Sequence, residues 1–451
     1  MKRKLSVFVL MLVLVLSGCS ILPEDSPIIL DGDVIEVTES KPGKGTKKSQ
    51  EASTQTEGAS TEASSEETTV ETASEEESTE TEPEVEEEGE DEEWVELPDG
   101  GEQNPIGERE VQEEKKQSYL TGQWKDETIV NRRNIAVMIP NGMYAAAGQN
   151  APLLKPYGLS KASIIYEAPV EGRGTALMGI FEDYDNLEMI GPIDSSRDYF
   201  IYQSMSFDSI YVNWGMARIW TEELINSNRV DNISAPTGGI AKPCEDAFFR
   251  DEMIIPDANK NNNGYISIEM LVKAIEEQGY ETDYRESFEQ AYLFANDSLA
   301  AYEGYPNITK IWPGGTLQNA GGYGNMGDLN PYFEYDPEKH LYYRYQNGDA
   351  LRDNWNQKKI GVTNVVLKFC HGEERMPNDA RYDFLAFGIH GTGECCVFTN
   401  GKMIKGTWSK ASDPGADYLY DEEGRQIVLN QGKTWICCIW KEFGQFAVYE
   451  E

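Results

Sequence analysis

The stretch SIIYEAPVEGRGTALMGIF, residues 163–181, reads as two buried strands joined by a polar turn. Ser163–Glu167 and Ala176–Phe181 are short, mostly apolar runs of the kind that form strands inside a sheet. Pro169 has no backbone N–H to give to a neighbouring strand, so the first strand is expected to end near it or to lie at an edge. The stretch therefore predicts a fold organised around a sheet, with residues 171–174 forming a turn.

Helix and strand patterns alternate on both sides of this stretch. Two further apolar runs, Asn134–Ile139 and Ser209–Val212, read as strands. Three helices are predicted, one starting at Ser195 with the capping-box spacing to Asp198, one over Ala217–Asn226, and one from Ser267 to Gly279. Because strands alternate with helices, we expect an α/β domain over residues 123–290.

The last third of the chain has a different pattern. Several β-rich runs are separated by turn signals, and the strongest is Asn400-Gly401, since a type I′ turn needs positive φ at both central residues. NVVLKF (364–369) and TWICCIW (434–440) add further strands. This pattern predicts a mostly antiparallel β domain over residues 300–451.

The N-terminal residues predict an export signal and a lipid anchor. Three basic residues precede the apolar run Leu5–Leu16, which is too short to span a bilayer and fits a signal peptide of residues 1–18. Leu16-Ser17-Gly18-Cys19 resembles a lipobox, so we expect Cys19 to be lipidated and inserted in the bilayer. The protein would then lie at the outer face of the cytoplasmic membrane.

Residues 19–122 are expected to form a disordered acidic tether. Between residues 19 and 120 there are 32 Asp and Glu residues against 7 Lys and Arg, and Ser, Thr and Glu dominate. So few large apolar side chains cannot offset the entropy lost on ordering. The whole chain has a formal net charge of −40, which argues against a nucleic-acid partner because phosphate contacts need clustered Lys and Arg.

Cysteine and histidine usage gives little sign of a metal or cofactor. The three histidines are scattered and no CxxC spacing occurs, so we expect no metal site and no cofactor. Two vicinal pairs, Cys395-Cys396 and Cys437-Cys438, leave two alternatives open. One thiol of each pair could form a cross-strand disulfide, or all four could be buried free thiols.

Several motifs in the right order resemble the YerB-like bacterial lipoproteins, a two-part family of unknown function. They include YEAPVEG, GIF, IGP and SSRDYF in the first part, and NGKMIKGTWSK and LNQGKTWI in the second. The resemblance covers about residues 130–445. The chain departs from the family pattern at Arg173, where a glycine is usual, and at Asp194, where an arginine is usual. Any basic pocket that the family implies is therefore weakened here.

The candidate binding residues lie near the central turn. Glu167 and Glu171 would face the same side of one extended strand, about 13 Å apart, which is too far for a glycosidase carboxylate pair. Ser195 at a helix start and Arg197 beside it could bind an anion, although a capping role for Ser195 is the competing interpretation. The remaining candidates are Arg173 in the turn, and Trp214 and Arg218. Trp214, with Tyr211 and Trp220 beside Arg218, could stack on a sugar or peptide, and a place in the core is the competing interpretation. We assign no catalytic residue.

Two functional hypotheses follow. The first is a non-enzymatic envelope lipoprotein that docks onto a membrane or cell-wall protein and regulates it. The alternative is an envelope enzyme, such as a Mg²⁺-dependent glycopolymer phosphotransferase acting at Arg173 and Arg197, because the pattern of strand, polar turn with Arg and Ser-Ser-Arg-Asp-Tyr loosely resembles the LytR–CpsA–Psr family. Arginines that are usual in YerB-like proteins are missing from this region. Their absence counts against the enzyme, so the docking hypothesis is preferred.

Overall fold

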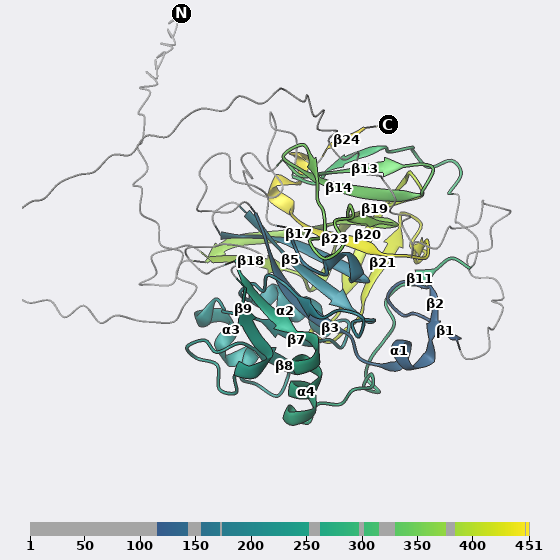
Figure 1. Ribbon diagram of the computed structural model, residues 1–451. Helices are drawn as coiled ribbons and strands as arrows, with labels where there is room; N and C mark the ends of the chain where they lie inside the picture. The colour runs from purple at the N-terminus through teal and green to yellow at the C-terminus, as the bar shows by residue number, and fades with distance from the viewer. Residues whose placement is uncertain are drawn as a thin grey trace, which may run out of the picture. The chain divides into compact units, whose positions relative to one another are not determined.

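The computed structural model describes residues 115–142, 155–171, 174–251, 262–296, 302–314, 330–375, 384–446 and 448–450 (Figure 1). The predicted signal peptide, the lipidation site Cys19, the tether up to residue 114 and the candidate Arg173 lie outside these ranges. Strand β1 (Lys115–Gln117) lies in the segment assigned to the tether, and Ser118, Leu120 and Thr121 are buried. Residues 115–122 are therefore structured, which corrects the predicted end of the tether at residue 122.

One eleven-stranded sheet receives strands from both predicted segments. Its path runs β21-β20-β19-β17-β23-β4-β5-β3-β7-β8, and β18 pairs with the far half of β17. The first segment supplies β3 (Ile135–Asn141), β4 (Ile164–Val170), β5 (Gly174–Phe181), β7 (Ile210–Asn213) and β8 (Asn232–Ser234). The second supplies β17 (Asn364–Arg375), β18 (Phe384–Gly388), β19 (Gly391–Thr399), β20 (Lys402–Lys410), β21 (Asp417–Asp421) and β23 (Thr434–Trp440). The two sets meet where β23 pairs in parallel with β4.

A six-stranded sheet and three small sheets complete the β-structure of the described residues. The six-stranded sheet contains β12 (Lys310–Trp312), β13 (Tyr332–Asp336), β14 (Leu341–Gln346), β15 (Asp349–Ala350), β16 (Gly361–Val362) and β24 (Val448–Glu450). The small sheets pair β1 (Lys115–Gln117) with β2 (Trp124–Asp126), β11 (Leu293–Phe294) with β22 (Val428–Leu429), and β10 (Gly264–Ser267) with both β6 (Met189–Ile190) and β9 (Phe248–Arg250).

The described residues contain four α-helices: α1 (Glu127–Asn131), α2 (Asp198–Met205), α3 (Arg218–Ile225) and α4 (Ile268–Gln278). The predicted helix from Ser267 to Gly279 is confirmed as α4. The Ser267 hydroxyl accepts a hydrogen bond from the Met270 N–H, and Gly279 ends the helix at φ 71°. Within the described ranges, none of the helices has both the length and the apolar character that a bilayer crossing requires.

The two faces of the large sheet carry separate parts of the core. Side chains alternate along β4, so Ile165 packs on one face and Tyr166 on the other. The Ile165 face contacts the six-stranded sheet through Phe333, and α4 through Leu271. The Tyr166 face packs against Phe200 of α2 and against α3. A sheet covered on both sides explains why its central strands are apolar at almost every position.

The described residues form mostly β-sheet with few helices. This confirms the β-rich character, but not the finer prediction of an α/β domain followed by a β domain. Individual predicted elements are confirmed, including the hairpin at Asn400-Gly401, whose φ angles are 48° and 71°. Strands from both segments lie in one sheet, so the sheet does not mark a boundary between two domains. The boundaries 123–290 and 300–451 therefore remain a prediction.

The vicinal cysteines are too far apart for the disulfide that the sequence left open. Leu367 of β17 pairs with Cys396 on one side and Cys437 on the other, so one strand separates the two pairs. Strands two apart are roughly 10 Å from each other, whereas a disulfide requires Cα atoms within about 7 Å. In the described part of the chain, Cys395, Cys396, Cys437 and Cys438 are buried thiols outside any disulfide, as in the second alternative.

Candidate functional site

An ion pair holds the turn that follows β4. Arg197 donates to the same carboxylate oxygen of Glu171 from Nε at 2.8 Å and from Nη2 at 2.6 Å. The other oxygen accepts the backbone N–H of Leu385, in β18, at 3.1 Å. The side chains of Glu171 and Arg197 are only 18% and 16% exposed. The turn is therefore fastened both to the segment before α2 and to a strand from the second half of the chain.

Ser195 joins this cluster but does not cap a helix, so the predicted helix start is wrong. Helix α2 begins at Asp198, and Arg197 precedes it with extended φ and ψ of −128° and 151°. Ser196 forms a parallel bridge with Met216, and this pairing keeps the backbone extended where a helix was expected. The Ser195 hydroxyl instead accepts a hydrogen bond from Arg197 Nη1 at 2.8 Å.

Two carboxyl groups of the cluster have pKa values shifted in opposite directions. Burial would raise the pKa of Glu171, but Arg197 outweighs it and holds that pKa below its usual value. Burial raises the pKa of Asp194, against the opposing effect of Arg197, and the charge of Glu171 adds to the rise. Carboxyl pairs whose pKa values diverge occur at proton-transfer sites and also in structural ion pairs.

The guanidinium of Arg197 has little capacity left for a ligand. Its Nη1 also donates to the carbonyl oxygen of Ser196 at 3.0 Å, so Nε, Nη1 and Nη2 all have partners inside the protein. Glu171 raises the pKa of Arg197 in spite of burial, so this group stays charged. The arrangement is suited to fixing the turn rather than to gripping a pyrophosphate.

Further polar residues, which sequence reasoning did not find, come from distant parts of the chain. Arg375 of β17 donates to Asp198 at 2.7 Å, and its guanidinium lies 4.9 Å from the centre of the Trp220 ring. The Tyr199 hydroxyl donates to the carbonyl oxygen of Pro169 at 2.6 Å. Arg375 ends the polar run HGEER, and nothing in that run indicates its partners. Only the sheet pairing brings it to α2 and α3.

Glu167 lies on the opposite face of the sheet from this cluster. It accepts hydrogen bonds from Arg344 Nη2 at 2.7 Å, Trp435 Nε1 at 2.9 Å and Thr175 Oγ1 at 2.8 Å. Glu167 and Arg344 are both completely buried. The expectation that Glu167 and Glu171 face the same side is wrong, because β4 ends at Val170 and the chain turns before Glu171.

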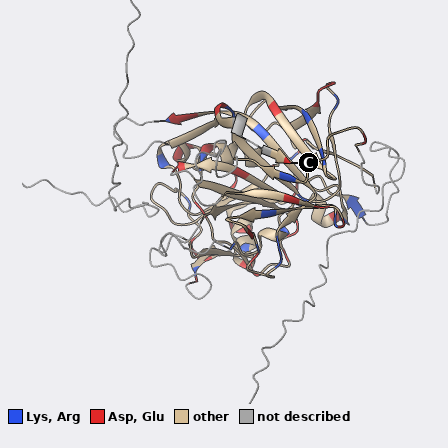
Figure 2. Cartoon of the chain, turned by 90° about the horizontal axis from the view of Figure 1, so that it is seen from above, with Lys and Arg blue, Asp and Glu red and all other residues tan. Residues whose placement is uncertain are grey.

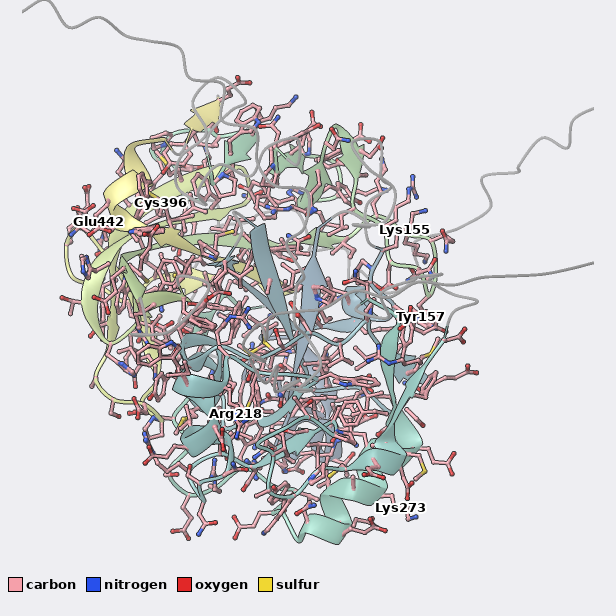
Figure 3. The ribbon with its side chains drawn as sticks, turned by 90° about the vertical axis from the view of Figure 1, so that its left-hand side faces the viewer. Lys155, Tyr157, Arg218, Lys273, Cys396 and Glu442 are labelled. Carbon is pink, nitrogen blue, oxygen red and sulfur yellow. The ribbon has the colours of Figure 1, made fainter. Side chains whose placement is uncertain are left out.

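The remaining candidates are separate from the cluster. Arg218 is exposed on α3 and pairs with Glu222 (Figure 3). Trp214 is half-buried, with its ring 5.6 Å from that of Phe248 and with the Arg250 guanidinium 4.3 Å from its ring centre. Of the predicted site residues that the structure describes, it therefore brings together Glu171, Ser195 and Arg197 and leaves Glu167, Trp214 and Arg218 elsewhere.

The charges of the described part are distributed rather than gathered. Lys and Arg are interspersed with Asp and Glu along the elements (Figure 2). In the part of the chain that the structure describes, no three His, Cys, Asp or Glu side chains lie in an arrangement that could hold a metal ion.

Comparison with known proteins gives a family. Residues 120–281 match the N-terminal domain, and residues 323–436 the C-terminal domain, of a family described as "Protein of unknown function (DUF3048)". The chain is 26% identical over 321 residues to YerB of Bacillus subtilis (strain 168), whose name describes it as a lipoprotein. That match covers 70% of this chain and 84% of the relative.

A solved structure shows the same fold. The crystal structure of YerB from Bacillus subtilis matches with a TM-score of 0.56 at 22% identity, covering 74% of this chain and all of the solved chain. The two family domains occur in the same order as the motifs that resembled the family. This chain belongs to the YerB-like family of two-part proteins of unknown function.

Proposed function

We propose that this protein is a lipid-anchored, extracytoplasmic binding module that docks onto another protein of the cell envelope and regulates it. The predicted signal peptide and Cys19 support the anchor, and so does the name of the relative YerB. The predicted disordered tether of about 100 residues would have a root-mean-square span near 55 Å, which would let the folded part reach a partner away from the lipid surface.

The observation that carries the docking proposal is the surface formed by Arg218, Ile219 and Trp220 of α3 and Arg375 of β17, here called the α3 surface. Ile219 is 60% exposed, the largest exposed fraction among the large apolar side chains that the structure describes. Arg218 beside it is 58% exposed. Trp and Arg dominate the energetics of protein interfaces, and an exposed aliphatic side chain next to them adds apolar contact area.

The α3 surface is rigidly supported. Arg375 contacts the Trp220 ring and forms an ion pair with Asp198 at the start of α2. The contact with Arg375 and the ion pair behind it would keep the Trp220 side chain in place before binding.

Photo-crosslinking in intact cells of the native host tests this proposal. A photoreactive amino acid replaces Glu223, which is exposed on α3, and in a matched control it replaces Lys273, whose side chain is 56% exposed on α4 (Figure 3). We expect one envelope protein to be captured from position 223 and not from position 273. The change Ile219→Asp, made together with the probe at position 223, should reduce that capture at least about tenfold.

Two results would contradict docking at this surface. If positions 223 and 273 capture the same proteins, the contacts are collisional. If no protein is captured and a prenyl-linked glycan is retained instead, the phosphotransferase alternative would replace the docking proposal.

A further inference from the structure

A cavity of about 440 Å³ lies between the end of α2 and three loops. Its lining residues do not include Glu171, Ser195 or Arg197. Arg229 and Arg285 line it, together with the apolar side chains of Met205, Phe288 and Pro414. The volume is within the range of small-molecule sites, which combine apolar walls with a few polar groups. The loops around residues 228, 286 and 413 approach each other only in the folded chain.

Each of the two carboxylates in the cavity wall is already paired with a cation of the protein. Asp208 accepts the backbone N–H of Arg285 at 2.8 Å and its Nε at 2.5 Å. A second cation, the buried Arg133, lies 3.4 Å from the same carboxylate. Asp413 contacts Arg229 and His390, and Arg229 supplies its counter-charge, because burial lowers the pKa of His390 below its usual value. Neither carboxylate therefore presents an uncompensated negative charge to the cavity.

The two arginines, in contrast, have donors to spare. Among the described residues, nothing accepts a hydrogen bond from Nε or Nη1 of Arg229, or from Nη1 of Arg285. Their side chains are 53% and 36% exposed, so both guanidinium groups are accessible. A guanidinium fork with free N–H groups matches the geometry of a carboxylate or phosphate.

The wall that carries Asp413 is preformed. Lys410 of β20 is completely buried, and its ammonium group donates to the carbonyl oxygens of Ser412 at 2.6 Å, Asp413 at 2.5 Å and Gly415 at 3.0 Å. Burial lowers the pKa of Lys410 to about 8, so at neutral pH the ammonium form still prevails and holds the loop. On the other side, the Phe288 ring stacks on Tyr284 at 4.2 Å between centroids, which fixes its orientation.

We infer that this cavity binds a small organic anion. The carboxylate or phosphate group of the ligand would contact Arg229 and Arg285, and its apolar portion would lie against Phe288 and Met205. Since the whole chain has a net charge of −40, long-range attraction does not favour an anion, and recognition would depend on these short-range donors. The inference concerns a different part of the molecule from the α3 surface and does not rest on the docking proposal.

Calorimetric titration of the full-length lipoprotein in detergent tests the inference. Phenyl phosphate and N-acetylphenylalanine serve as an aromatic phosphate and an aromatic carboxylate. Inorganic phosphate supplies an anionic group without a ring, and benzyl alcohol supplies a ring without a charge. We expect at least one aromatic anion to bind with 1:1 stoichiometry and more tightly than inorganic phosphate or benzyl alcohol. Tighter binding of phenyl phosphate would indicate a phosphate-bearing ligand, and tighter binding of N-acetylphenylalanine a carboxylate such as a peptide end.

Arginine variants locate the binding. Arg229→Gln should weaken binding of the better probe at least about tenfold, since it removes charge-assisted hydrogen bonds from a half-exposed side chain. Arg285→Gln is the second variant, with its folding checked by its unfolding temperature. The matched control is Arg425→Gln, which removes a guanidinium paired with Asp421 outside the cavity. No saturable binding of either aromatic anion, or equal binding in Arg229→Gln and Arg425→Gln, would overturn the inference.

Discussion

Glu167 and Glu171 stand four residues apart, yet the fold gives them opposite environments. Glu167 points into the layer between the two large sheets and pairs with Arg344, and both side chains are completely buried. Glu171 follows the end of β4 and pairs with Arg197, and both side chains keep about a sixth of their surface exposed. Each glutamate joins the first half of the chain to the second, Glu167 through β14 and β23 and Glu171 through β18.

The difference shows that the same pairing of carboxylate and guanidinium has different consequences at different depths. Removing one member of a buried pair leaves an uncompensated charge in a medium of low polarity, whereas water can solvate the survivor of a half-exposed pair. The Arg344 guanidinium also packs against two rings, 4.7 Å from the centre of Phe333 and 5.0 Å from that of Trp435. The buried pair is therefore part of the packing between the sheets.

The largest effect is expected at the buried pair. Arg344→Met should lower the free energy of unfolding by about 3–5 kcal/mol, because Glu167 would remain buried without its counter-charge. Urea denaturation of the full-length protein, followed by tryptophan fluorescence, measures the change. Combining it with Glu167→Leu should recover at least half of the loss, since two apolar side chains can replace a buried pair. A loss below about 1 kcal/mol in the single variant would remove the contrast with Glu171.

A smaller effect, with a defined pH dependence, is expected at the half-exposed pair. Glu171→Gln should cost about 1–2 kcal/mol at neutral pH, through weaker hydrogen bonds to Arg197 and Leu385. Because Arg197, outweighing the effect of burial, holds the pKa of Glu171 below its usual 4.5, the carboxylate's contribution is complete above pH 4.5. It is lost as the pH falls through the folded-state pKa.

The difference in unfolding free energy between wild type and Glu171→Gln should therefore be constant near neutral pH and should shrink as the pH falls into the acid range. Denaturation at a series of pH values measures it, with the exposed Glu223→Gln on α3 as the control that should show little difference at any pH. A gap that persists unchanged to pH 2 would mean that Glu171 does not act through its charge.

The smallest effect compares two serines that both precede helices. Ser267→Ala should cost about 1 kcal/mol because the Ser267 hydroxyl caps α4. Ser195→Ala should cost only about 0.5 kcal/mol, since Arg197 Nη1 keeps its second acceptor, the carbonyl oxygen of Ser196. The same denaturation assay measures both. Equal costs would show that Ser195 supports α2 in spite of its extended backbone.

Local signals predicted most of the elements. Ser267 and Gly279 bound α4 as expected, because capping depends on residues within one turn of the helix. The Asn400-Gly401 turn is confirmed because positive φ at two successive positions is a local property of those residues. The Ser195 helix start failed although its spacing was correct, since pairing of Ser196 with Met216 determines the backbone there.

The candidate site was predicted only in part for the same reason. The sequence suggested Glu171, Ser195 and Arg197, which lie within 26 residues of one another, and the structure brings them together. Arg375 and Leu385 could not be found, because their contacts depend on β17 and β18 lying beside the turn. The Arg229 and Arg285 cavity has no sequence signature, since its wall consists of loops from distant parts of the chain.

The sequence by itself determined the predicted export signal, the β-rich second half, and the helices and hairpins whose signals lie within a few residues. It also carried the family motifs, because motif order is a property of the chain alone. Only the tertiary structure decided which glutamate is buried, that both halves share one sheet, and that the vicinal cysteines are separated by a strand. Those outcomes depend on strand pairing between residues tens to hundreds of positions apart, and no local pattern specifies such pairing.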